Sequence, residues 1–415
     1  KEGGRLGLIT SNSWLDVDYG GDLQRFFLEN FKIKAIIESK VERWFEDADI
    51  NTAITILERC SNPEERNKNV VRFVQLKKPL SEFIPPVEDE SKRWAYVEKL
   101  IKLIESRDGY YEDDGIRIFT KKQKELWDEG YDVEEELYIG SKWGKYIRAP
   151  TIFFKILEKG KGLLIELKDV AKIKRGFTTN VKNFFILSES DVQKFKIERE
   201  FLKPAISQPK DIKKPVVERD DVKHFILWVR KPKTDLVGTN VLKYLLWGEA
   251  QKFNTKTPRK DDMWYCFSEV DVPPIFVPFI IWQRHFVSLN KANAYSEHNF
   301  YWIYPDDVSI TPFIAAFLNS TLAWLFTEIY GRHPLGQGAL EIMRYEYATM
   351  PIIDPVKVKE YLPIIEDIFY NLAKRKIGTI FEEIGADSPE EVSLDKVKPD
   401  RRELDKIIMG KILGL

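Results

Sequence analysis

The sequence feature that most constrains the fold lies in the middle of the chain, where residues 167–187 read LKDVAKIKRGFTTNVKNFFIL. The first half of this stretch alternates apolar and charged residues, a pattern typical of a half-buried strand. Lys172, Lys174 and Arg175 are followed by Gly176, where the backbone can turn or approach another group closely. The closing FFIL predicts a return to the core. The stretch therefore predicts a basic turn held between two apolar strands.

Such a turn suits contact with DNA. Lysine and arginine bind backbone phosphates, and short polar side chains such as Thr178, Thr179 and Asn180 reach phosphates or base edges. A surface hairpin with ordinary exposed cations is the alternative, and it explains this stretch better when the stretch is taken alone. The motifs on either side of this stretch favour contact with DNA instead.

Four further motifs flank the turn in a fixed order. They are Trp143, Tyr146, Arg148 and Pro150 upstream, then Leu318-Asn319-Ser320, Gly336-Gln337-Gly338 and the segment MPIIDP at residues 350–355. In this order and spacing the chain resembles the target-recognition half of adenine-specific DNA methyltransferases, especially the fused type IIG restriction–modification enzymes. Each motif is loose by itself, and the resemblance rests on their succession over most of the chain.

Composition bounds the class of protein. A chain of 415 residues, 43% hydrophobic and 32% charged, predicts two or three domains with sizeable cores. Cys60 and Cys266 form neither a metal cluster nor a disulfide framework, and no apolar run is long and uncharged enough to span a bilayer. We therefore expect a cytoplasmic protein with no membrane partner and no metal site.

The net charge of −1 conceals a local asymmetry. Residues 82–136 carry 17 acidic and 9 basic side chains, a balance of −8, whereas residues 203–260 carry 14 basic and 6 acidic ones, a balance of +8. A local positive field fits a DNA-binding face, although a charge run is more often a solvated surface. We favour DNA because the basic part lies inside the expected recognition region.

The N-terminal residues predict a strand–helix–strand–loop–strand succession. The apolar run Leu6–Thr10 is predicted to be a buried parallel strand, Gly20-Gly21 to start an amphipathic helix, and residues 33–38 and 50–57 to form two more strands. This order is similar to the last third of a Rossmann-like methyltransferase domain. The final two strands of that domain form an antiparallel hairpin.

The resemblance assigns a role to the loop between those two strands. In the family an aromatic residue there stacks on the flipped-out adenine, and the matching position here is Phe45. A ring face can hold a base that has left the duplex. The alternative is that Phe45 caps the core while Trp44 points outward, and without the family pattern this alternative is preferred.

The resemblance also implies S-adenosylmethionine as the methyl donor of the complete enzyme, yet two expected motifs are missing. No Gly-rich turn follows a first strand, and Pro85-Pro86 and Pro273-Pro274 lack the polar residue before and the aromatic residue after that the family's amine-gripping motif requires. We therefore expect no cofactor-binding residues in this chain. An N-terminal catalytic half, in the same parent chain or a separate polypeptide, would supply them.

Base reading is predicted further downstream. Gln283 and Arg284 lie between apolar anchors, and glutamine fits adenine while arginine fits guanine. A strand whose polar groups alternate outward is an equally good explanation. Arg332, in the turn after an expected amphipathic helix at residues 312–330, is predicted to approach the DNA backbone or the catalytic half.

The predicted fold class is α/β and α+β, in four parts. Residues 1–84 form the last strands of a Rossmann-like methyltransferase domain, 85–162 a helical connector, 163–355 a β-rich target-recognition domain and 356–415 C-terminal helices. Strands within the third part are expected at residues 225–229, 275–279, 280–282, 286–289 and 300–303.

Together these patterns predict the part of a site-specific adenine DNA methyltransferase that reads double-stranded DNA and holds the target base. A non-catalytic DNA specificity module is the first alternative, and an α/β scaffold without a DNA role is the second. The predicted hairpin favours the methyltransferase, because a pure reader has no use for it.

Overall fold

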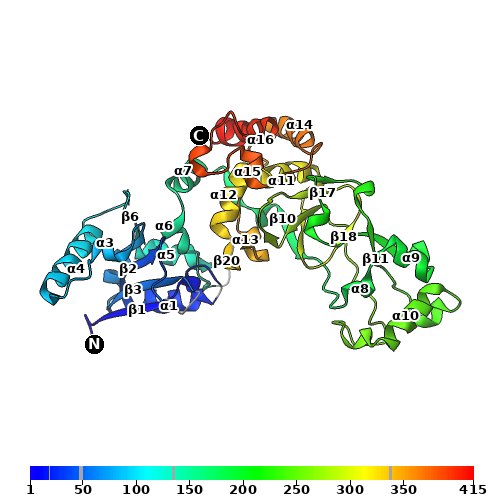
Figure 1. The fold of residues 1–415 in the computed structure, drawn as a ribbon, viewed down its shortest axis with the longest axis horizontal. Coiled ribbons are helices and arrows are strands. Elements are labelled where there is room, and N and C mark those ends of the chain that lie inside the picture. Colours follow the sequence, from blue (N-terminus) through cyan, green and yellow to red (C-terminus); the bar gives the residue numbers. More distant parts are fainter. Residues whose placement is uncertain (18, 46–49, 133–135, 336–338) are drawn as a thin grey trace. The chain divides into compact units, whose positions relative to one another are not determined.

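The computed structural model describes residues 1–17, 19–45, 50–132, 136–335 and 339–415. The chain divides into two compact units, Lys1–Thr151 and Ile152–Leu415, each with its own sheets and helices (Figure 1). Both units mix helices with strands, as the predicted fold class requires.

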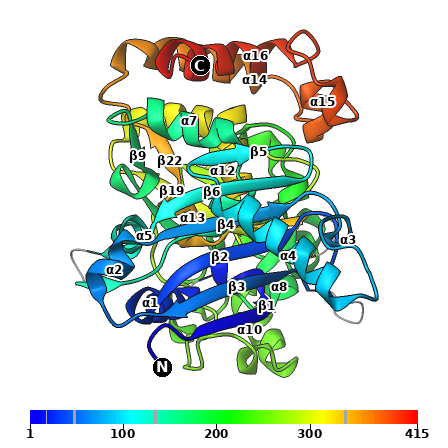
Figure 2. The same cartoon turned by 90° about the vertical axis from the view of Figure 1, so that its left-hand side faces the viewer.

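The first unit is built on a six-stranded mixed sheet with the strand order β1-β3-β2-β4-β6-β5. Figure 2 shows the strands in this order, with α4 crossing in front of them. The strands are β1 (Arg5–Ser11), β2 (Phe31–Ser39), β3 (Thr52–Arg59), β4 (Val70–Leu76), β5 (Tyr110–Glu112) and β6 (Ile116–Lys122), with a separate pair, β7 (Tyr131–Asp132) and β8 (Leu137–Tyr138). The helices are η1 (Asn12–Leu15), α1 (Gly20–Asn30), α2 (Pro63–Lys68), α3 (Leu80–Phe83), α4 (Glu90–Glu105), α5 (Gln123–Gly130) and α6 (Gly144–Arg148).

The predicted antiparallel hairpin is present. β2 and β3 pair in opposite directions, and β1 pairs antiparallel with the other side of β3, so β1 and β2 run the same way with β3 reversed between them. The prediction of a buried parallel strand at Leu6–Thr10 is wrong, because β1 is an edge strand whose described neighbour is antiparallel. Leu6 and Ile9 are 43% and 52% exposed on it.

The expected helical connector also needs correction. Its first helix is present as α4, but β5 and β6 extend the sheet beyond β4 instead of forming helix. Ile116 and Ile118 alternate into a core with Val74 and Leu76. The turn between these two strands is acidic, which hides the hairpin in the sequence. The Asp113 carboxylate accepts hydrogen bonds from the backbone amides of Gly115 and Ile116 and so closes the turn.

The Trp143 motif closes the core of the first unit. Trp143 is fully buried and packs edge-to-face on Trp14 and Phe73, with ring centroids 5.8 and 6.1 Å apart. Trp143 and Tyr146 of this family motif are therefore core residues.

An ion pair completes this core. The Arg148 guanidinium donates two hydrogen bonds of 2.9 Å to the Glu38 carboxylate and one of 2.7 Å to Asp16. Glu38 is buried, so its charge depends on this partner.

The second unit contains two larger sheets and two smaller ones. Their strand orders are β10-β19-β15-β17-β13, β11-β14-β12-β18, β16-β21-β20 and β22-β9. The strands are β9 (Leu164–Glu166), β10 (Ala171–Arg175), β11 (Ile186–Ser188), β12 (Leu202–Ile206), β13 (Val216–Val217), β14 (His224–Leu227), β15 (Ile275–Pro278), β16 (Ile280–Ile281), β17 (Ser288–Asn290), β18 (Tyr295–Ser296), β19 (Phe300–Pro305), β20 (Arg332–Leu335), β21 (Ala339–Glu341) and β22 (Pro351–Ile353).

Helices cover and connect these sheets. The α-helices are α7 (Thr151–Lys159), α8 (Lys182–Phe185), α9 (Glu189–Phe195), α10 (Asn240–Ala250), α11 (Thr311–Leu318), α12 (Thr321–Tyr330), α13 (Arg344–Ala348), α14 (Leu362–Leu372), α15 (Ile380–Ile384) and α16 (Pro399–Asp405). The shorter or irregular turns are η2 (Leu167–Asp169), η3 (Arg199–Phe201), η4 (Pro209–Asp211), η5 (Arg219–Asp221), η6 (Lys233–Leu236), η7 (Phe253–Thr255), η8 (Val308–Ile310), η9 (Lys359–Tyr361), η10 (Pro389–Glu391) and η11 (Lys406–Ile412).

The single helix expected at residues 312–330 is wrong, because α11 and α12 meet at an angle of 77°. The Asn319 side chain accepts from the Val287 amide (3.1 Å) and donates to the Val287 carbonyl (2.8 Å), and Ser320 caps α12. In the described chain no single helix is long and apolar enough to cross a membrane; the bent pair formed by residues 308–318 and 321–330 passes by length and composition alone.

Replacing Arg148 by alanine is expected to lower the free energy of unfolding by about 2–3 kcal/mol, because Glu38 would keep a buried charge without its partner. The figure is below the full range for buried pairs because the Arg148 side chain is 35% exposed. Arg25→Ala, which removes an exposed contact with Asp22, is the matched control and should cost less than about 1 kcal/mol. Urea unfolding measures both, and equal losses would contradict the role given to the pair.

Candidate nucleic-acid interface

The basic turn joins the two larger sheets of the second unit. β10 pairs antiparallel with β19, whereas β11, the next strand along the chain, pairs with β14 in the other sheet. β10 and β11 therefore do not form a hairpin with each other. Along β10, Ala171 and Ile173 face the core while Lys172 and Lys174 are exposed, as alternation in a strand requires. Phe184 and Phe185 return to the core in α8, not in a strand.

A close backbone contact fixes the end of β10. A Cβ atom at Gly176 would lie 2.2 Å from the carbonyl oxygen of Glu297, so a side chain has no room there. The Glu297 carboxylate is buried, accepts a hydrogen bond from the Thr179 hydroxyl, and lies 3.7 Å from the Lys182 ammonium. Thr179 is itself 1% exposed, so it holds the turn and does not face solvent.

The other predicted groups of the turn face solvent. Thr178 and Asn180 are exposed, and Asn180 adopts a left-handed backbone with φ of 55°. The Lys174 ammonium lies 5.1 Å from the centre of the Tyr304 ring, and the Arg175 guanidinium lies 5.1 Å from that of Phe279. Burial raises the pKa of the Tyr304 phenol, which stays neutral beneath the lysine. These rings orient the cations while leaving their charges accessible.

Gln283 and Arg284 lie in the loop after β16. The Gln283 side chain is exposed, and the Arg284 guanidinium lies over Phe286 and donates a long 3.4 Å hydrogen bond to the Ile212 carbonyl. Both residues line a hollow of about 290 Å³, and Trp282 beside them is 55% exposed. An aromatic ring, an amide and a guanidinium therefore share one concave surface.

Arg175 and this loop lie near the same end of the five-stranded sheet. β10, β19 and β15 are successive neighbours in the five-stranded sheet, and Phe279, the residue beneath Arg175, directly follows β15. Pro278 and Ile280, on either side of Phe279, line the same hollow as Gln283 and Arg284. The cations of β10 and the Gln283–Arg284 loop therefore lie near the same end of the five-stranded sheet, although none of the described β10 residues lines the hollow.

Arg332 does not join this surface in the same way. Its guanidinium donates a 2.7 Å hydrogen bond to the fully buried Glu346 carboxylate and lies over the Tyr345 ring. The ion pair between Arg332 and Glu346 therefore holds α13 against the start of β20. The Gly336-Gln337-Gly338 motif lies outside the described residues.

His285 belongs to the core below the loop. It is 3% exposed and stacks on Trp324, and burial together with the charge of Arg401 lowers its pKa to about 3. The imidazole is therefore neutral at ordinary pH and supports the loop without contributing charge.

Phe45 lies in the first unit, in the loop after β2. It is 48% exposed, whereas Trp44 packs on the core that contains Val74, Ile104 and Ile118. The alternative in which Phe45 caps the core and Trp44 points outward is therefore wrong. The following residues, 46–49, lie outside the described residues.

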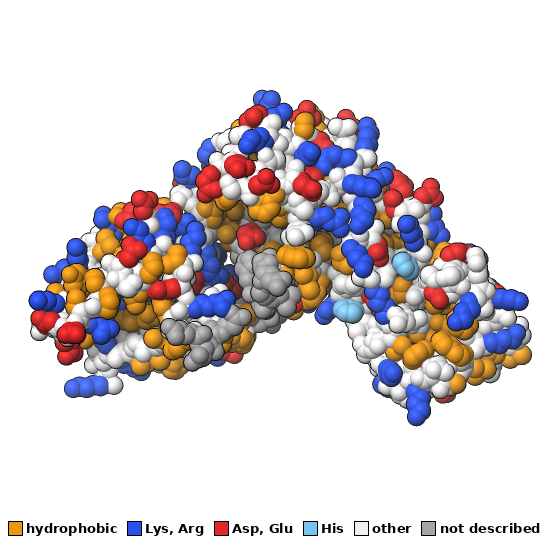
Figure 3. All heavy atoms as spheres, in the orientation of Figure 1, with side chains coloured by type: hydrophobic (Ala, Val, Ile, Leu, Met, Phe, Trp, Pro, Cys, Tyr) orange, Lys and Arg blue, Asp and Glu red, His pale blue; other side chains and the backbone are white. Residues whose placement is uncertain are grey.

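One set of cations was not predicted as a site from the sequence. Lys210, Lys213, Lys214 and Lys223 line a second hollow in the second unit. Figure 3 shows Lys and Arg side chains gathered over the region where Figure 1 labels β17 and β18. The local balance of +8 was the available signal, but it does not tell which lysines share a surface.

Comparison with known proteins gives the family. Residues 141–385 match the family model of the type II methyltransferase M.Eco57I, C-terminal domain. The type II methyltransferase M.AccI of Acinetobacter calcoaceticus is 22% identical over 290 residues, which is 66% of this chain and 45% of that protein. Among solved structures, the type IIL restriction–modification enzyme MmeI in complex with DNA superposes with a TM-score of 0.51 at 12% identity, covering 99% of this chain and 47% of that one. The type IIG restriction endonuclease BpuSI gives 0.46 at 13% identity, covering 100% and 47%.

The matched segment exceeds half of the chain, and it spans the basic turn, both hollows and the Gln283 loop. The chain therefore belongs to the family of type II methyltransferase C-terminal domains that M.Eco57I represents. The predicted relationship to restriction–modification methyltransferases is confirmed at this level. The chain spans about half the length of the relatives that it matches.

Proposed function

We propose that this chain is the DNA-recognition and target-base-holding part of a site-specific adenine DNA methyltransferase of a restriction–modification system. One observation carries the proposal. Exposed cations on β10 and the Gln283–Arg284 loop with its hollow lie near the same end of one sheet, inside the segment that matches the family model. A reader of duplex DNA needs both kinds of group together, because phosphate contacts set the register in which base contacts select the sequence.

The two kinds of group have different tasks in this proposal. Lys172, Lys174 and Arg175 bind phosphates and contribute affinity for any sequence. Gln283 and Arg284 reach base edges in the groove, where an amide pairs with adenine and a guanidinium with guanine. Arg332 is better assigned to holding α13 than to contacting DNA, because its charge is already matched by Glu346.

The first unit supports the methyltransferase part of the proposal. The order β1-β3-β2, with the middle strand reversed, agrees with the closing strands of the Rossmann-like methyltransferase sheet that the sequence resembles. Phe45 follows β2 and offers an exposed ring in the loop where the family places its base-stacking residue. An adenine rotated out of the duplex would stack on that ring.

S-adenosylmethionine would serve the complete enzyme, and the Gly20-Gly21 pair of the first unit is packed against neighbouring backbone. A Cβ atom at Gly20 would lie 1.9 Å from the Trp14 carbonyl oxygen, and one at Gly21 would lie 2.5 Å from that of Ile139. Both glycines allow a close approach of neighbouring backbone. We assign the methyl donor to an N-terminal catalytic half, whose strands would pair with the open edge of β1.

A non-catalytic DNA specificity module is the second candidate. The hollows of the second unit fit it as well, since reading DNA requires no chemistry. The exposed Phe45 favours the methyltransferase, since a module that leaves the duplex intact gains nothing from a free ring beside a closing hairpin.

Neutralising Lys172, Lys174 and Arg175 together by glutamine is expected to weaken binding to all duplexes alike. The slope of log K against log[salt] should fall by about 0.9 for each lost phosphate contact. Gln283→Ala and Arg284→Ala should instead change which sequences are enriched from a randomised duplex pool. Binding titrations over a salt series, with sequencing of the bound pool, separate these effects, and the same response from both sets of variants would refute the division.

Phe45→Ala in the complete enzyme is expected to lower methylation about tenfold or more, because stacking on a flipped base contributes about 1–3 kcal/mol. Phe45→Tyr should keep most of the activity. Phe26→Ala on α1, another exposed phenylalanine, is the matched control and should leave methylation near wild type. Transfer of labelled methyl groups to duplex DNA measures all three, and equal activity of the folded Ala and Tyr variants would remove Phe45 from the site.

A further inference from the structure

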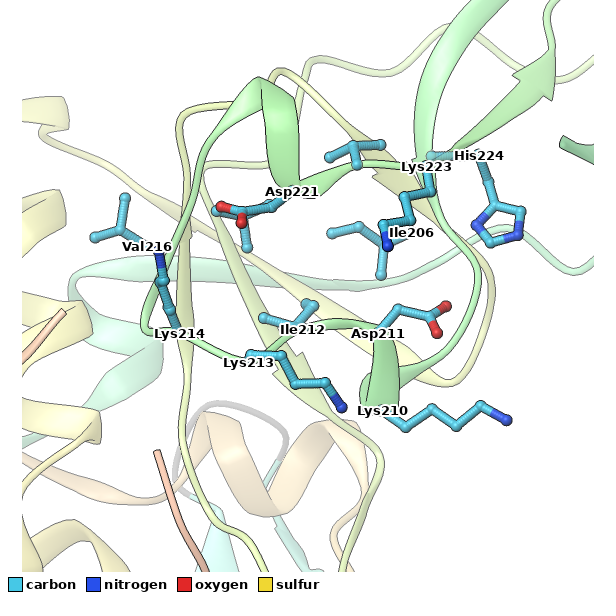
Figure 4. Close-up of a pocket in the computed structure, with 13 residues that line it drawn as sticks. Ile206, Lys210, Asp211, Ile212, Lys213, Lys214, Val216, Asp221, Lys223 and His224 are labelled. Atoms are coloured by element: carbon cyan, nitrogen blue, oxygen red, sulfur yellow. The ribbon is translucent and has the colours of Figure 1, made fainter. Parts of the chain in front are cut away.

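A second hollow in the second unit has the chemistry of an anion site. Its volume is about 310 Å³, and it lies where the chain leaves β12, forms η4, enters β13, forms η5 and continues into β14. Lys210, Lys213, Lys214 and Lys223 stand around it, and Ile206 and Ile212 lie between them (Figure 4). Two consecutive loops and two sheets thus build one basic depression.

The charges around this depression are available to a ligand. Within the described part of the chain, the side chains of Lys210, Lys213, Lys214 and Lys223 form no ion pair or hydrogen bond. The two aspartates of the rim are already engaged, because Asp211 accepts from the Gln208 amide and Asp221 from the Glu218 amide, both at 3.0 Å. These carboxylates cap their own short turns and keep their charge, so the four lysines and two aspartates of the lining give a balance of +2.

The floor of the depression is apolar. Ile206, Ile212, Val217 and Val222 are buried there, each 9% exposed or less. A bare inorganic anion would gain no favourable contact from such an apolar floor. A ligand with a hydrocarbon part between charged groups does, and the deoxyribose–phosphate chain of DNA has this chemistry, with phosphate oxygens for the lysines and sugar carbons for the aliphatic side chains.

The depression is continuous with the base-reading surface. Lys210 and Ile212 line both this hollow and the one that contains Gln283 and Arg284, and the Arg284 guanidinium donates to the Ile212 carbonyl. A DNA strand whose bases meet the Gln283–Arg284 loop would therefore reach the lysines with its flanking phosphates.

We infer that the hollow ringed by Lys210, Lys213, Lys214 and Lys223 binds the sugar–phosphate backbone of one DNA strand beside the bases that Gln283 and Arg284 read. This inference rests on the proposed function and adds to it a second phosphate-binding surface, distinct from the β10 cations. Because it contacts backbone alone, the surface adds affinity and register without changing sequence preference.

The test compares triple variants of the 415-residue chain in binding to mixed-sequence duplex DNA over a salt series. Lys210→Gln, Lys213→Gln and Lys223→Gln together should lower the slope of log K against log[salt] by about 0.9 per contact, which is roughly an eightfold loss per contact at 0.1 M salt relative to 1 M. The same three positions changed to arginine should bind as wild type. Lys359→Gln, Lys406→Gln and Lys411→Gln together, an equal charge change at exposed lysines that do not line the hollow, should also bind as wild type.

The outcomes separate the two claims. If wild type binds DNA and the pocket variant keeps its slope and affinity, the inference is overturned while the proposed function stands. If the variant at Lys359, Lys406 and Lys411 loses as much DNA affinity as the variant at Lys210, Lys213 and Lys223, the effect is one of net charge and the inference is overturned as well. If wild-type protein binds no duplex at low salt, the proposed function fails and the pocket assignment fails with it. Thermal unfolding of each variant establishes that it is folded, and the single Lys213→Gln variant repeats the test with a smaller change.

Discussion

The contact on which the candidate interface depends is that between the backbone at Gly176 and the chain at Glu297. No side chain fits at Gly176, and the Glu297 carboxylate, itself buried, draws in Thr179 and Lys182. A hydrogen bond to a charged group contributes about 1.5–3 kcal/mol, so this cluster determines where β10 ends. The direction of Lys174 and Arg175 at the end of β10 follows from that end point.

Several residues that carry the family resemblance turn out to hold the fold and not to face a ligand. Trp143 fills the core of the first unit, and Asn319 ties the corner between α11 and α12 to the backbone of Val287. Arg148 neutralises the buried Glu38. Trp143 fills core volume, while Asn319 and Arg148 each satisfy a buried group from a distant part of the chain. Such roles make these residues good markers of a family and poor guides to its specificity.

What the sequence predicted is what local patterns encode. Strands β14, β15 and β19 and the β2–β3 hairpin follow from alternation and turn residues, which depend on neighbours along the chain. The predictions of a buried strand at Leu6–Thr10 and of one helix at residues 312–330 were both wrong. The exposure of β1 and the break before Ser320 depend on partners far away in sequence. Thr179 was predicted as a contact from its type alone, and its burial became evident only with Glu297 in place. The hollow lined by lysines could not be predicted, because residues 210–214 come to lie beside Lys223 only when the two sheets have formed.

Hydrogen exchange of the 415-residue chain, with and without saturating duplex DNA at low salt, is the measurement that bears directly on whether the second unit reads DNA. We expect slower amide exchange on DNA binding in three segments, residues 176–183, 208–224 and 280–286, and unchanged exchange in α4 of the first unit. Protection confined to the first unit, with these three segments unaffected, would contradict the account.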